Sequence, residues 1–184
     1  MHNRLFLALL LTLAASAAAA HTGAGVQGGL TSGFTHPLFG WDHVAAMVAV
    51  GLWGAFLGAP AIWVLPVVFP LVMAFGGALG VAGVPLPSVE TGIALSGVVL
   101  GLLVALAVRA PLWIAAVLVG AFAIFHGHAH GTELPEAANP FAFALGFVLA
   151  TGMLHLAGIG FGFLTAVPRG QYAVRAAGGV IALA

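Results

Sequence analysis

The chain has 184 residues, of which 62% are hydrophobic and only 4% carry a charged side chain. Soluble domains are about half apolar and about a quarter charged, so this composition excludes a water-soluble protein and predicts an integral membrane protein. The chain has no cysteine, which excludes disulfides and thiolate metal ligands. It also has no lysine for a phosphate-binding P-loop, and its formal net charge of +0 gives no sign of nucleic-acid binding.

The first twenty residues have the pattern of a secretory signal peptide. Arg4 precedes an apolar run, and small residues follow up to Ala20. We therefore expect residues 1–20 to be a cleaved signal peptide and residues 21–184 to be a single transmembrane domain with its mature N-terminus outside. The alternative is an uncleaved first transmembrane helix. Cleavage after Ala20 would make His21 the first residue, which could hold an incoming cation or could simply mark the cleavage site.

Six apolar segments follow, separated by short connections. About 20 apolar residues are needed to cross a bilayer core of roughly 30 Å. The sequence therefore predicts an all-α bundle of about six transmembrane helices, at residues 42–59, 61–83, 89–108, 111–128, 140–165 and 171–184. The last segment rises only about 21 Å, which is short for a full span.

The charged residues divide between the two sides of this predicted bundle. With the N-terminus outside, Arg109, Arg169 and Arg175 lie on or beside cytoplasmic turns, as the positive-inside rule requires. The acidic residues fall on the outer side, at Asp42, Glu90, Glu133 and Glu136. We therefore expect an outer vestibule that attracts cations.

Glycine and proline are placed where they affect helix packing. Small residues four apart, such as Gly76 and Gly80, let membrane helices approach closely. Pro66 and Pro70 lie inside the second segment, where each removes a helical donor and frees the carbonyl of Ile62 or Pro66, four residues earlier. Such carbonyls can line a polar path, although a simple kink is the commoner explanation.

The first polar cluster is in THPLFGWDH, which contains His36, Asp42 and His43. Imidazole and carboxylate together suit divalent Ni, Co, Zn, Cu or Fe. A turn over residues 37–41 would fold His36 back over the other two. Asp42 is then a direct ligand, a residue that orients a ligating histidine, or only the N-cap of the helix. Met47, one turn after His43, is expected in the core rather than as a thioether ligand.

The second polar cluster is in FHGHAHGTE, where His126, His128 and His130 precede Glu133. If the fourth helix continues through it, His126 and His130 share one face and His128 points elsewhere. The glycines that follow His126 and His130 also allow a looser backbone, in which all three rings converge. A histidine-rich loop without a specific site would explain either cluster alone, but two clusters on one side of the bundle favour a metal site.

His155 lies deeper, roughly 24 Å from the outer end of the fifth segment. With Thr151 one turn earlier, it is either the inner station of a cation path or a packing residue. Glu90, near the outer end of the third segment, is either a further ligand or an interfacial cap. The candidate metal ligands are His36, Asp42, His43, His126, His128, His130, Glu133 and His155.

Three stretches resemble the signatures of the HupE/UreJ family: HPLFGWDHVAAMVAVGLWGA, FHGHAHGTELP and ATGMLHLAG. The resemblance extends from the signal peptide to the last helix. It implies a nickel or cobalt permease, or an accessory protein, associated with hydrogenase or urease in the bacterial inner membrane. It also implies that the histidines and carboxylates of these motifs are the metal ligands.

The residues themselves predict an outer-side site for a divalent cation, and nickel comes from the resemblance. The expected cargo is Ni²⁺, with Co²⁺ or Zn²⁺ as alternatives, and no organic cofactor is expected. Two other functions would use the same side chains. One is a membrane zinc hydrolase with Glu133 as general base, and the other is a metal-binding accessory or sensor protein. The expected partners are the cation and the lipid bilayer, and the sequence is also compatible with a homo-oligomer.

Overall fold

The computed structural model of the protein describes residues 29–134 and 139–184. The expected signal peptide at residues 1–20, His21 and Glu136 lie outside the described residues. The described residues form seven α-helices and one short 3-10 helix. In chain order these are α2 (Leu30–Phe39), α3 (Trp41–Leu57), α4 (Ala61–Val81), α5 (Val89–Ala105), α6 (Leu112–Thr132), α7 (Pro140–Gly162), η1 (Phe163–Ala166) and α8 (Gly170–Leu183).

Each of the six apolar segments expected from the sequence coincides with one helix, from α3 to α8, and the ends differ by a few residues. The difference that matters most is at the end of α6. This helix continues to Thr132, so the whole FHGHAHG stretch is helical. The histidines of that stretch are therefore held on a regular helix rather than on a loop.

Helix α2 is the element that the sequence does not predict. The expected turn over residues 37–41 is wrong in extent, because α2 includes Pro37 and ends at Phe39. The chain then bends by 83° into α3. A Cβ atom at Gly40 would lie 3.2 Å from Asp42 Oδ1 and 3.2 Å from His43 Nδ1. Glycine therefore leaves room at this corner for the two polar groups that follow it.

Several helices are long and apolar enough to cross a bilayer. Ala61–Val81, Leu112–Thr132 and Pro140–Ala166 each qualify, and the bent pair α2–α3 is a fourth candidate. The chain is therefore a multi-pass membrane protein. Helix α5 is apolar but has 17 residues, and α8 has 14, so both are short for a bilayer core that needs about 20 residues.

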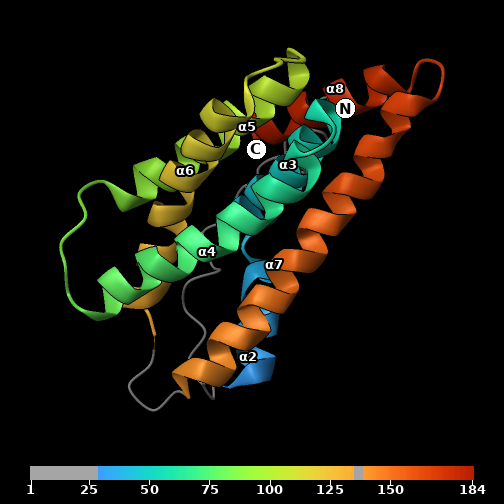
Figure 1. The fold of residues 1–184 in the computed structure, drawn as a ribbon. Coiled ribbons are helices and arrows are strands. Elements are labelled where there is room, and N and C mark those ends of the chain that lie inside the picture. The colour runs from blue at the N-terminus through green and yellow to red at the C-terminus, as the bar shows by residue number, and fades with distance from the viewer. Residues whose placement is uncertain (1–28, 135–138) are drawn as a thin grey trace, which may run out of the picture.

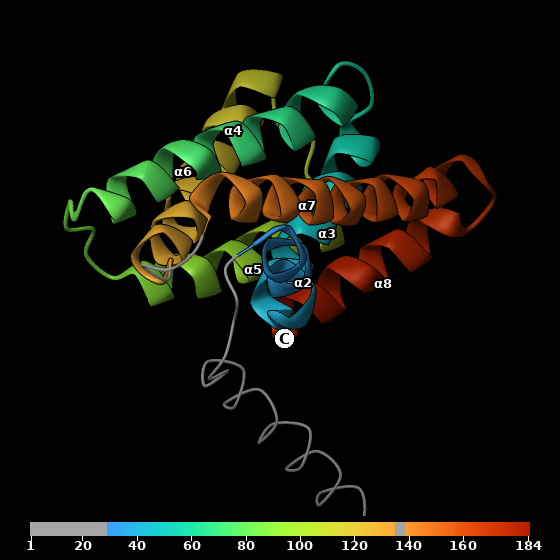
Figure 2. The same cartoon turned by 90° about the horizontal axis from the view of Figure 1, so that it is seen from below.

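The helices pack in pairs (Figure 1), of which α4 with α6 and α3 with α7 run parallel and α5 with α8 runs antiparallel. Helix α4 packs along α6, α7 packs along α2 and α3, and α5 packs along α8. Figure 2 shows α7 across the middle of the bundle, with α4 on one side and α8 on the other. The starts of α3 and α7 and the end of α6 thereby lie towards the same end of the bundle.

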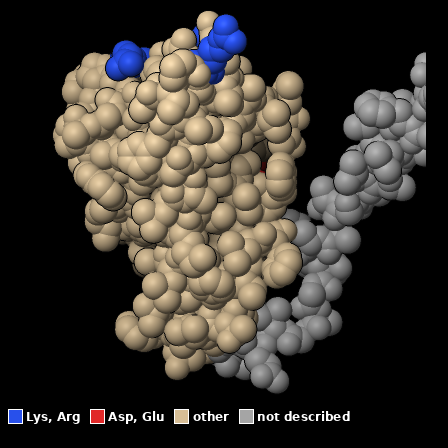
Figure 3. Space-filling model, turned by 90° about the vertical axis from the view of Figure 1, so that its right-hand side faces the viewer, with Lys and Arg blue, Asp and Glu red and all other residues tan. Residues whose placement is uncertain are grey.

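The arginines that the structure describes lie at the opposite end. Arg109 stacks on Phe56 at the end of α3, with its Cζ atom 4.8 Å from the ring centroid. Arg175 Nε donates a hydrogen bond to the carbonyl of Ala105, at 2.8 Å. Figure 3 shows basic side chains at one end of the face in view and an acidic group in a hollow below them. The basic groups thus lie on one side of the bundle, as the sequence-based topology expects.

Helices α4 and α6 approach each other to backbone distance. A Cβ atom at Gly127 would lie 1.9 Å from the carbonyl oxygen of Met73. Cβ atoms at Gly76 and Gly80 would lie 2.4 Å and 2.5 Å from carbonyl oxygens of α6, which confirms the expected small-residue packing. The glycine between His126 and His128 therefore packs against α4 and does not loosen the helix.

The core between the helices is apolar and contains the expected Met47, which is 0% exposed. Trp53 is also fully buried, and its Nε1 donates to the carbonyl of Val108 at 3.0 Å. This hydrogen bond ties the middle of α3 to the α5–α6 connection. The polar groups at the start of α3 form a separate cluster, which lies against α6.

Candidate metal site

Three helices bring the candidate ligands together. His36 comes from α2, Asp42 and His43 from the first turn of α3, and His126 and His130 from the last turns of α6. The chain bends by 83° after Phe39, and side chains of both α2 and α3 reach the end of α6. Two clusters that lie 83 or more residues apart in sequence therefore form one site.

The inner part of the site consists of three imidazoles, which we call the histidine triad: His43, His126 and His130. His43 Nε2 lies 3.3 Å from His126 Nδ1 and also contacts His130 Nε2. His43 is 6% exposed and His126 is 0% exposed. Nitrogen ligands about 2.0–2.1 Å from a metal lie about 2.9–3.4 Å from one another in octahedral or tetrahedral geometry. The separation of the His43 and His126 nitrogens is thus that of two ligands on one ion.

Hydrogen bonds determine which nitrogens of the triad bear a lone pair. Asp42 Oδ1 lies 3.0 Å from His43 Nδ1, and a carboxylate can only accept, so His43 Nδ1 carries the proton. Ser96 Oγ donates its one proton to the Ile93 carbonyl at 2.6 Å, so it accepts from His126 Nε2 at 2.8 Å. His43 Nε2 and His126 Nδ1 are therefore both unprotonated and both face the centre of the triad.

The Asp42 carboxylate orients the His43 ring, which is the geometry of the second role considered for it. It also accepts a hydrogen bond from the His43 backbone N–H at 2.9 Å. The N-cap of α3 is Gly40, and no side chain caps that end. A carboxylate behind a ligating histidine fixes its tautomer and makes the free nitrogen a better donor.

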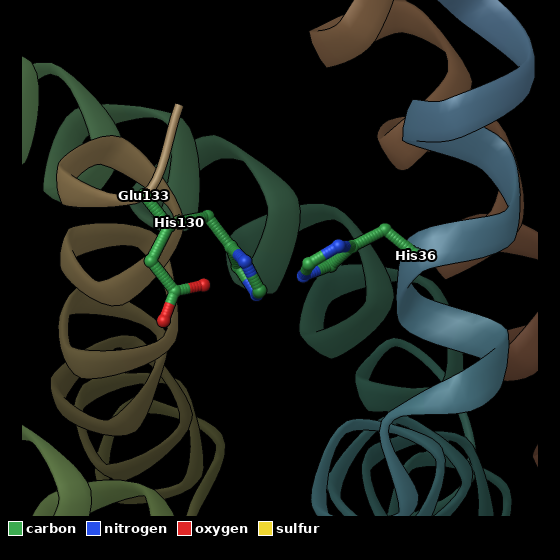
Figure 4. Close-up of side chains that lie close together, drawn as sticks. All are labelled: His36, His130 and Glu133. Atoms are coloured by element: carbon green, nitrogen blue, oxygen red, sulfur yellow. The ribbon is translucent and has the colours of Figure 1, made fainter. Parts of the chain in front are cut away.

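An outer group of candidate ligands meets the triad at His130. One ligand atom each of His36, His130 and Glu133 lies within 4.8 Å of the others. Figure 4 shows the His36 and His130 rings pointing toward each other from α2 and α6, with the Glu133 carboxylate beside His130. The two ring centroids are 4.8 Å apart. His130 is therefore shared between an accessible group and a buried one.

A cavity of about 200 Å³, which we call the vestibule, leads to both groups. Its ionisable lining consists of His36, Asp42, His43, Glu90, His130 and Glu133. Glu90 and Glu133 are exposed, and Asp42 is 42% exposed. Three carboxylates around one small cavity favour the entry of a cation.

Two candidates from the sequence lie outside this cluster. His128 points away from the triad, and its Nε2 is hydrogen-bonded to the Val84 carbonyl at 2.7 Å in the α4–α5 connection. His155 lies within α7 and contacts the ring of Phe69, at a centroid distance of 5.5 Å. The structure therefore unites His36, Asp42, His43, His126, His130 and Glu133 in one site, and places His128 and His155 elsewhere.

Ser96 is a member of the site that sequence reasoning missed. It is 0% exposed and holds His126 through its hydroxyl. The available signal was a hydroxyl in the apolar part of the helix, six residues after Glu90. A serine that bonds only to its own helix gives the same signal. Its pairing with a histidine thirty residues away required the tertiary structure.

Comparison with known proteins identifies the family of the chain. The family described as HupE / UreJ protein matches residues 9–184. The chain belongs to the HupE/UreJ family. It is 50% identical over 169 residues to Protein HupE of Rhizobium leguminosarum bv. viciae, and the match covers 92% of this chain and 88% of that protein. No solved structure matches the chain significantly. The resemblance drawn from the three histidine motifs is confirmed.

Proposed function

We propose that this HupE/UreJ protein is a permease for a divalent transition-metal cation, with Ni²⁺ as the principal cargo and Co²⁺ as the alternative. The observation that supports this most directly is the histidine triad. Three imidazoles converge at the inner end of an acidic vestibule, and two of them present lone pairs fixed by Asp42 and Ser96. Imidazole with carboxylate suits such cations, and nickel itself follows from the family resemblance.

Capture begins in the vestibule. The carboxylates of Asp42, Glu90 and Glu133 attract the hydrated cation, and His36, His130 and Glu133 replace the first waters. His130 then keeps the cation as His43 and His126 replace the outer ligands. Because one ligand belongs to both groups, the cation is never without a protein ligand during this exchange.

The direction of transport follows from the charge distribution. The arginines mark the cytoplasmic side by the positive-inside rule, so the vestibule opens to the outer side of the bacterial inner membrane. In this topology α3 to α8 are the six spans, the mature N-terminus is outside, and the cation supplies hydrogenase or urease maturation. The site would bind a transported ion, so no catalytic residue is assigned.

Radioactive nickel uptake into proteoliposomes tests this function. We expect saturable uptake by the wild type, competition by Co²⁺ and Zn²⁺, and loss of uptake in His43→Ala and His126→Ala. His128→Gln is the matched control. It is a change of histidine on the same helix, and its amide still reaches the Val84 carbonyl.

The other two functions give different results in the same experiment. Tight nickel binding without flux into the vesicles would indicate an accessory or sensor protein. Turnover of a lipid or peptide by the purified protein, dependent on Glu133, would indicate a zinc hydrolase. Equal uptake by wild type and triad variants would contradict the proposed role of the triad.

A further inference from the structure

Two polar side chains of α7 are buried without a hydrogen bond. His155 is 1% exposed, and Thr151, one turn earlier on the same face, is 0% exposed. Neither ring nitrogen of His155 nor the Thr151 hydroxyl has a hydrogen-bond partner within the described residues. Nearly all buried polar groups in proteins are paired, so two unpaired side chains on one helix face point to a ligand.

Helix α4 contributes a third polar group at this place. The carbonyl of Pro66 would normally accept a hydrogen bond from the backbone N–H of residue 70, but Pro70 has none. This carbonyl lies beside the His155 ring, without the geometry of a hydrogen bond. An imidazole and a freed carbonyl therefore lie together across the contact between α4 and α7, and the Thr151 hydroxyl is one turn from the imidazole on the same face of α7.

Phe69 connects this place with the histidine triad. Its ring is 0% exposed and lies one turn after Pro66 on α4. The ring centroid is 5.6 Å from that of His126 and 5.5 Å from that of His155. Within the described part of the chain, His126 and His155 make no direct ring contact. The Phe69 ring is therefore the neighbour that the triad and His155 share.

We propose that His155, Thr151 and the Pro66 carbonyl form a second, inner cation station, and that Phe69 is the aromatic barrier between this station and the triad. The inference rests on the proposed transport function and specifies its next step. The station takes a divalent first-row transition-metal ion, because a nitrogen donor with two oxygen donors suits such ions. His155 lies about sixteen residues along α7 from the vestibule end, so the station is further towards the arginine end.

Phe69 suits the role of a barrier for two reasons. Its ring has no lone pair to coordinate a metal, so a cation cannot rest at this point. The ring is also fully buried, so it fills the space between the triad and His155. Phe69 thus separates the triad from the inner station, and the two do not form one continuous polar channel.

The test measures nickel binding and nickel flux separately, by equilibrium dialysis and in proteoliposomes. His155→Ala removes the imidazole, Thr151→Val removes only the hydroxyl, and Pro70→Ala restores an N–H that occupies the Pro66 carbonyl. Each should keep the affinity of the triad and lower flux by about tenfold or more, the scale of loss for groups that support a metal site. Thr165→Val is the matched control, because the hydroxyl of Thr165 in η1 donates to the carbonyl of Gly162, the last residue of α7, at 2.9 Å.

Two further measurements complete the test. Phe69→Leu, which shortens the barrier, should raise flux without changing triad affinity. The wild type should also show a second, weaker nickel-binding step that is absent in His155→Ala, which tests the station independently of flux. If triad variants abolish transport while the His155, Thr151 and Pro70 variants behave like wild type in both assays, the inner station is wrong and the proposed function stands. A wild type that shows the second binding step but no flux would overturn the transport function and leave the station.

Discussion

His43 and His126 face each other through ring nitrogens that both carry a lone pair, 3.3 Å apart. Two lone pairs at this distance repel each other unless a proton or a cation lies between them. His130 Nε2 contacts His43 Nε2, and the other nitrogen of His130 has no hydrogen-bond partner in the described residues. Because His43 Nε2 has a lone pair, His130 Nε2–H donates to it when no metal is bound, and transfer of that proton to Nδ1 would free His130 Nε2 for a metal.

The first prediction concerns Asp42, which holds His43 in its ligating tautomer. Asp42→Asn keeps the size of the side chain but removes the charge, so we expect nickel affinity to fall by about 10–100-fold. Equilibrium dialysis of the purified protein measures this. The loss should persist at high salt, because a hydrogen bond between neighbouring groups is little screened. Unchanged affinity would mean that the carboxylate does not orient His43.

The second prediction concerns Ser96, whose hydroxyl holds His126. Ser96→Ala leaves the Nε2 proton of His126 without an acceptor and the ring free to change tautomer. We expect nickel affinity to fall by about tenfold, with no loss in Thr165→Val measured alongside. If Ser96→Ala binds nickel like the wild type, the orientation of His126 must come from its packing alone.

The third prediction concerns Glu90, which lines the vestibule but does not belong to either ligand group. Glu90→Gln should slow nickel uptake at low ionic strength, because one of the attracting charges is lost. The difference from wild type should shrink as salt is added up to about 1 M, where the screening length is about 3 Å. A defect of equal size at all salt concentrations would instead identify Glu90 as a direct ligand.

The fourth prediction concerns Gly127, which packs against the α4 backbone. Gly127→Ala places a methyl group only 1.9 Å from the Met73 carbonyl oxygen. We expect a loss of about 1–3 kcal/mol of stability from overpacking, seen as a lower midpoint of thermal unfolding in detergent. Gly152→Ala on α7 is the matched control, because nothing lies within 4 Å of a Cβ atom there. A similar midpoint for the two variants would contradict the close contact of α4 and α6.

Much of the site could be predicted because it is encoded locally. In a chain this apolar, the few polar side chains are easily recognised, and helical spacing places His126 and His130 on one face. The same spacing predicts that His128 points elsewhere once α6 is helical, as the structure shows. The alternative, in which all three rings converge, fails because Gly127 packs against α4 in a regular helix.

Apolar segment length, charge asymmetry and the order of the histidine motifs determined by themselves that the chain is a multi-pass helical membrane protein of the HupE/UreJ family. These properties depend on residues close in sequence and on partition between lipid and water. Only the tertiary structure decided that the chain turns by 83° at Gly40, that Ser96 holds His126, and that the Pro66 carbonyl and Phe69 lie against His155. Each of these depends on contacts between helices far apart in sequence, and helix packing sets such contacts with no local signal in the residues involved.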